Sequence, residues 1–159
     1  MRGELFGLAG MRALTNVLAF GFISGLLWSI VPGTLGNLFS SRGDVPATVA
    51  AGIFSGVVTS LVLAAFLGRV GRVVTVLLGF LSLPFGAFVF GFTLAMIDRL
   101  LPAITSQSRA ILDPWTLGAN YAVLSVVSIF AIGLFPLAVL TTLFLRSFVI
   151  RGKSTARPQ

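Results

Sequence analysis

The charged residues of this chain are confined to a few short segments, and this distribution is the strongest constraint on its fold. Only 9% of its 159 residues are charged and 57% are hydrophobic, whereas soluble domains carry about 25% charged residues. A charge placed inside membrane hydrocarbon is costly, so each charged segment marks a point where the chain leaves the membrane. The sequence therefore predicts an integral membrane protein.

The segments between the charges form four apolar stretches, each long enough for a transmembrane helix of about 20 residues. They are Ala13–Val31, Pro46–Gly68, Val73–Ile97 and Trp115–Leu145. The fourth exceeds one crossing, which predicts a tilted helix or first turns that lie in the interface. We expect an all-α, polytopic protein with a compact four-helix bundle over residues 13–145. A short segment, 1–12, precedes the bundle, and a basic tail, 146–159, follows it.

Lysine and arginine are distributed unequally between the two ends of the predicted helices. Eight of the eleven lie on the side of the two termini. The positive-inside rule then predicts cytoplasmic termini, in a membrane of the bacterial inner-membrane type. Two of the eight are Arg2 and Arg12. The others form a basic rim that we expect to attract anionic lipid headgroups: Arg69, Arg72, Arg146, Arg151, Lys153 and Arg157.

The first two predicted helices share a pattern of small residues, which indicates either a duplication or a chance similarity between simple sequences. Small residues at every fourth position form a stripe on one helix face and allow two backbones to approach closely. We expect the two helices, or two copies of the chain, to pack through Gly21, Gly25, Ser29, Gly52, Gly56 and Ser60.

Ser24 and Ser55 occupy equivalent positions in the two similar helices and support a second interpretation. Inverted repeats with a binding site midway through the membrane are typical of transporters, and these two hydroxyls could line such a site. No predicted span has an ionisable residue in its interior, which argues against a path for protons or cations.

The residue types that most catalysts need are missing or scattered. The chain has no Cys and no His, and its four acidic residues are far apart in the sequence. This excludes disulfides and His- or Cys-based catalysis, and it leaves no ligand set typical of zinc, haem or iron–sulfur sites. We therefore predict a protein that is not an enzyme and that holds no cofactor or metal.

Three local motifs predict how helices begin and bend. Asp113 followed by Pro114 is typical of an N-cap and the first helical position. Asp113 and Arg99 both lie at the outer rim, where a cap or a salt bridge is the expected role. Pro84 and Pro136 lie inside predicted helices, and each should remove one backbone hydrogen bond and kink its helix.

These observations favour a non-catalytic accessory, assembly or scaffold subunit of a membrane complex, or a self-associating membrane component. Its expected partners are membrane lipids and other membrane subunits, or a second copy of itself. The net charge of +7 is read as an orientation signal, so no nucleic-acid partner is expected. The alternative is a small oligomeric channel or transporter for an ion or solute, with a mid-membrane Ser/Gly site.

Overall fold

The computed structural model describes residues 2–39, 45–100, 113–128 and 131–154. These residues form five α-helices. The helices are α1 (Arg2–Phe39), α2 (Val45–Leu67), α3 (Arg72–Leu100), α4 (Pro114–Val127) and α5 (Ala131–Ser154).

Four of the five helices are long and apolar enough to cross a membrane. The qualifying segments are Ala13–Ile30 within α1, all of α2, all of α3, and Ile132–Ile150 within α5. The remaining helix, α4, has 14 residues and is too short to cross alone. Over the described residues, the prediction of an all-helical chain with four helices long and apolar enough to cross a membrane is therefore confirmed.

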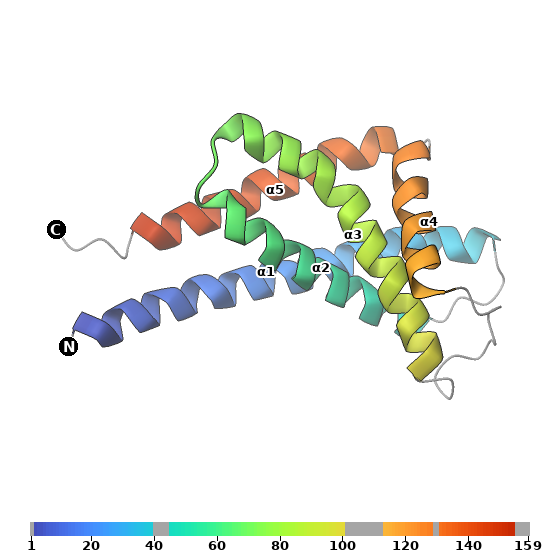
Figure 1. The fold of residues 1–159 in the computed structure, drawn as a ribbon, viewed down its shortest axis with the longest axis horizontal. Helices are drawn as coiled ribbons and strands as arrows, with labels where there is room; N and C mark the ends of the chain where they lie inside the picture. Colours follow the sequence, from blue (N-terminus) through green and yellow to red (C-terminus); the bar gives the residue numbers. More distant parts are fainter. Residues whose placement is uncertain (1, 40–44, 101–112, 129–130, 155–159) are drawn as a thin grey trace.

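The helices run back and forth between the two ends of the molecule, as Figure 1 shows. Helix α2 returns along α1, α3 reverses again after a short turn, and α4 stands against the second half of α3. Helix α5 then runs back beside α3 towards α1. The start of α1, the α2–α3 turn and the end of α5 consequently lie towards the same end of the molecule.

The first helix is longer than predicted at both ends. It begins at Arg2, within the segment 1–12 that was expected to precede the bundle, and it continues to Phe39 instead of ending at Val31. The added N-terminal segment 2–12 contains two Leu, two Arg, one Ala and one Met, which favour a helix, and also three Gly, which do not, so its composition alone did not predict the extension. Helix α2 lies within one residue of its predicted bounds, and α3 extends three residues further at its C-terminal end.

The prediction of one continuous helix over Trp115–Leu145 is wrong. The chain leaves the helical conformation at Ser128, whose φ of −63° and ψ of 142° are extended, and a separate helix begins at Ala131. The four residues from Ser125 to Ser128 include two serines and two valines, which have modest helix propensity. Continuous apolarity concealed this break, and Pro136 lies inside α5.

Two clusters of buried apolar side chains hold the helices together. The first cluster joins α1, α2 and α5 and consists of Val17, Leu63, Leu67 and Leu145. The second cluster joins α2 and α3 and consists of Ala47, Ala51, Phe90 and Leu94. They lie towards opposite ends of α2, which leaves the middle of the molecule to smaller and more polar side chains.

Candidate functional site

The contact between α1 and α2 is built on glycines that have no room for a side chain. A Cβ atom added at Gly21 would lie 2.8 Å from the Cα atom of Val57, and one added at Gly25 would lie 2.7 Å from the Cα atom of Ile53. On α2, a Cβ atom added at Gly52 would lie 2.8 Å from the carbonyl oxygen of Gly25. The two backbones are therefore in direct contact, as close packing of membrane helices through small residues requires.

The same contact includes the other small residues of the two faces. A Cβ atom added at Gly56 would lie 2.5 Å from the Cα atom of Gly25. One at Gly52 would meet the Cβ atom of Ser29 at 2.5 Å, and one at Gly21 would meet that of Ser60 at 3.1 Å. The structure thus brings together all six residues of the predicted packing faces: Gly21, Gly25, Ser29, Gly52, Gly56 and Ser60.

Ser24 and Ser55, the two serines next to the central glycines in the chain, line one cavity between the helices. The cavity has a volume of about 580 Å³. Side chains from all five helices line it, and those with hydroxyl groups are Ser24, Ser55, Thr59, Ser60, Ser82, Tyr121, Ser125, Ser128, Thr141 and Thr142. Among the described residues, no Asp, Glu, Lys or Arg reaches its wall.

The rest of the wall is mostly apolar and aromatic. Phe20 and Trp28 contribute from α1, Phe90 from α3, and Leu134 and Leu145 from α5. Ligand-binding pockets in proteins have volumes of about 300–1,000 Å³ and combine such apolar walls with a few polar groups. This cavity has both properties.

Four of the ten hydroxyl groups in the wall donate their protons within their own helices. Ser82 donates to the carbonyl oxygen of Gly79 at 2.7 Å, within α3. The same intrahelical pattern is found at Ser125 (2.7 Å), Thr141 (2.6 Å) and Thr142 (2.8 Å). These hydroxyls keep their oxygen lone pairs available as acceptors, while their protons are already used.

Ser55 and Thr59 differ from this pattern. The Ser55 hydroxyl donates across the helix contact to the carbonyl oxygen of Gly86 in α3, at 2.6 Å. Thr59 lies one turn further along α2, and its Oγ1 atom is buried and makes no hydrogen bond with any described residue. A Cβ atom added at Gly86 would lie 3.4 Å from Thr59 Oγ1 and 3.8 Å from Ser55 Oγ.

The break between α4 and α5 lies at the wall of the cavity. Ser128, where α4 ends, is one of the lining residues. Its N–H donates to the carbonyl oxygen of Leu124 at 3.0 Å and so closes the last turn of α4. Non-helical backbone within a membrane is tolerated where it is buried in protein or lines a cavity. The position of Ser128 meets this requirement.

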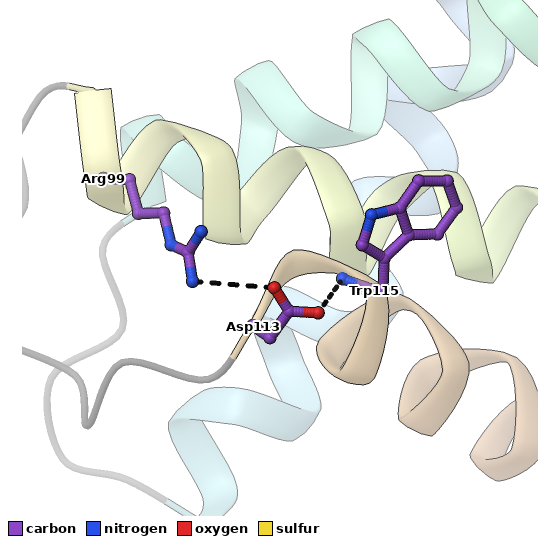
Figure 2. A network of polar contacts seen from close by, with 3 residues as sticks. All are labelled: Arg99, Asp113 and Trp115. Atoms are coloured by element: carbon purple, nitrogen blue, oxygen red, sulfur yellow. Dashed lines mark hydrogen bonds and ion pairs between the residues drawn. The ribbon is translucent and has the colours of Figure 1, made fainter.

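The N-terminal end of α4 is fixed by Asp113, as Figure 2 shows. Its Oδ2 atom accepts a hydrogen bond from the backbone N–H of Trp115 at 3.1 Å, and its Oδ1 atom lies 3.7 Å from Arg99 Nη2 of α3. The predictions of an N-cap and of a rim salt bridge are both confirmed. The Trp115 ring packs on Phe92, with ring centres 5.1 Å apart, so the start of α4 is tied to the end of α3.

At the opposite end, Arg146 of α5 reaches the α2–α3 turn. Its Nη2 atom donates to the carbonyl oxygen of Val70 at 3.2 Å, and its Nε atom is buried without a hydrogen bond to the described residues. Arg69 and Arg72 flank this turn and are exposed. Arg151 and Lys153, which also belong to the predicted basic rim, lie on α5, but the structure describes only their backbone. Arg157 lies outside the described residues.

Sequence reasoning identified Ser24 and Ser55 but missed the other hydroxyls of the wall. They are spread over four helices and share no spacing, because each helix turns a different face to the cavity. Gly86 of α3 was not predicted as a site residue, although it faces the two hydroxyls of α2. The sequence does not show how each helix is rotated about its axis, and this rotation decides which side chains face the cavity.

The described residues form an all-helical chain with four helices long and apolar enough to cross a membrane, and with a partly open, ligand-sized cavity whose described wall carries no charged side chain. No protein-family model, curated protein or solved structure matches this chain. The chemistry of the cavity is therefore the main evidence on its function.

Proposed function

We propose that this protein binds an uncharged, largely apolar small molecule in the cavity between its five helices and acts as a small membrane transporter or carrier. The observation that carries the proposal is the cavity of about 580 Å³, with its apolar walls and its hydroxyl groups. This size and this mixture of surfaces are typical of sites for small organic molecules.

The absence of charge from the described wall defines the class of ligand. A charged ligand held among these helices would lose its hydration without gaining a counter-ion, which costs far more than the burial of a neutral polar group. The wall offers hydroxyl oxygens instead, which suit a neutral ligand. We therefore propose an uncharged ligand and not an ion.

The break at Ser128 supports transport over simple packing. Transporters commonly use helices interrupted at the binding site, because the interruption exposes backbone groups and separates the motions of the two halves. Here α4 and α5 meet at an angle beside the cavity.

We further propose that both termini face the cytoplasm of a cell with a bacterial-type inner membrane. The start of α1, the α2–α3 turn and the end of α5 lie towards one end of the molecule. That end carries most of the basic residues, including Arg69, Arg72 and Arg146. Anionic lipid headgroups are the expected partners of this surface.

A subunit role, or self-association, is the second candidate, and it is supported by two exposed amides. Asn16 on α1 and Asn120 on α4 both lie on exposed helix surfaces. Amides on apolar helices favour association, because a neighbouring helix can provide the hydrogen bonds that lipid tails lack. Blue-native electrophoresis tests this candidate: it predicts a larger assembly for the wild type and a loss of that assembly in Asn120→Leu.

Native mass spectrometry of the protein in lipid nanodiscs tests the leading proposal. Ser125→Leu should fill part of the cavity, whereas Ser147→Leu removes an equivalent intrahelical hydrogen bond outside it. We expect a bound small molecule in the wild type and in Ser147→Leu, and less of it in Ser125→Leu. Equal occupancy in all three proteins, or none in any, contradicts the proposal.

A further inference from the structure

Thr59 provides an unused hydrogen-bond donor at the cavity. Among the described lining residues, it is the one with a buried side-chain oxygen that makes no hydrogen bond. A buried polar group without a partner costs about 1–3 kcal/mol, so a ligand atom that satisfies it recovers part of this free energy.

The surroundings of Thr59 form a small polar niche, which consists of Ser55, Thr59 and Gly86. Ser55 and Thr59 lie one helical turn apart on α2, and Gly86 faces both of them from α3. Because Gly86 has no side chain, the space over the two hydroxyls stays open. A Cβ atom there would be in ordinary contact, 3.4 Å from Thr59 Oγ1.

The hydrogen-bonding capacity of the wall indicates which polar group fits the niche. Ser55 and four other lining hydroxyls already donate their protons to backbone carbonyl oxygens and can only accept further bonds. Thr59 can donate. A ligand hydroxyl matches both, because it accepts from Thr59 and donates to a neighbouring oxygen.

We propose that the cavity takes a neutral amphiphile of the long-chain alcohol type, with its hydroxyl in the polar niche and its apolar chain against Phe20, Trp28 and Phe90. This inference rests on the proposed function and names the ligand class of the same cavity. The niche supplies one donor and at least one acceptor, and the remaining wall supplies apolar contact.

The chain offers a fluorescent reporter for this proposal. Trp28 lines the cavity, whereas Trp115, the other tryptophan, is 65% exposed on the outer surface. In a Trp115→Phe background, tryptophan fluorescence comes from Trp28 at the cavity, and saturation of the quenching distinguishes cavity binding from contact with probe in the bilayer. The probes are 11-bromoundecan-1-ol and 1-bromoundecane, whose bromine quenches tryptophan on contact and which differ in the hydroxyl group. The protein is held in lipid nanodiscs.

The expected result is saturable quenching of Trp28, with the alcohol binding more tightly than the alkane. Thr59→Val should weaken the alcohol about three- to tenfold, the effect of one hydrogen bond, and leave the alkane unchanged. Thr93→Val is the matched control, since Thr93 Oγ1 is also buried without a hydrogen bond but does not line the cavity. It should change neither affinity.

The outcomes separate this inference from the proposed function. If both probes bind saturably with equal affinity, or if Thr59→Val and Thr93→Val behave alike, the polar niche is wrong and cavity binding stands. If neither probe quenches Trp28 saturably, the result counts against cavity binding itself.

Discussion

The hydroxyl of Ser55 donates a hydrogen bond of 2.6 Å to the carbonyl oxygen of Gly86, and this bond ties α2 to α3 at the wall of the cavity. Ser55 lies beside the contact between α1 and α2, because its neighbour in the chain, Gly56, touches Gly25 of α1. Three helices are thus brought together at one point, and the polar niche forms there. The same contacts therefore pack the three helices together and form part of the candidate binding site.

Ser55→Ala should destabilise the protein modestly. The substitution removes one interhelical hydrogen bond and leaves the Gly86 carbonyl with its intrahelical partner, so we expect a loss of about 0.5–1 kcal/mol. Ser82→Ala is the control, because Ser82 donates within its own helix. Denaturant titration of both variants in detergent measures the difference. A Ser55→Ala protein as stable as Ser82→Ala would mean that the bond contributes nothing between helices.

Substitution at the glycine contact should have a larger effect. A methyl group at Gly25 or Gly56 would overlap backbone atoms of the facing helix, so Gly25→Ala and Gly56→Ala should each cost about 1–3 kcal/mol or separate α1 from α2. Gly133→Ala is the matched control, since an added Cβ atom there meets nothing within 4 Å. Thermal unfolding distinguishes them. Equal melting temperatures for the three variants would contradict the close packing.

The cap at Asp113 should matter more than its ion pair. Asp113→Ala removes a helix N-cap, which typically costs about 1 kcal/mol. Arg99→Ala removes only the ion pair, whose side chains are 43% and 53% exposed, and exposed pairs contribute little. Asp113→Asn keeps a capping oxygen and should resemble Arg99→Ala. Chemical unfolding monitored by Trp115 fluorescence in a Trp28→Phe background ranks the three variants. A larger loss of stability in Arg99→Ala than in Asp113→Ala would show that the ion pair contributes more than the cap.

The proposed topology can be tested with single cysteines, since the chain has no natural Cys. Arg72→Cys lies at the α2–α3 turn, and Thr116→Cys lies in the first turn of α4, near the other end of α3. In intact bacterial cells, a membrane-impermeant maleimide should label Thr116→Cys and spare Arg72→Cys until the cells are broken. The opposite labelling pattern would show that the protein has the inverse orientation in the membrane.

Several elements could be predicted from the sequence because their determinants are local. Apolar length located α2 to within one residue, and Asp113 with Pro114 indicated the start of α4. The break at Ser128 could not be found in this way, because apolarity continues through it. The cavity could not be predicted from the sequence either, because its lining depends on how each of the five helices is rotated about its axis. Pro136 was predicted to lie inside a helix and to kink it, and it lies inside α5.

Titration of Trp28 in the Trp115→Phe protein with 11-bromoundecan-1-ol tests the central claim most directly. Cavity binding predicts quenching that saturates in the wild-type cavity, persists in Ser147→Leu and is weakened in Ser125→Leu. Quenching that rises in proportion to the probe dissolved in the bilayer, and that is the same in all three proteins, would show that the cavity does not bind it.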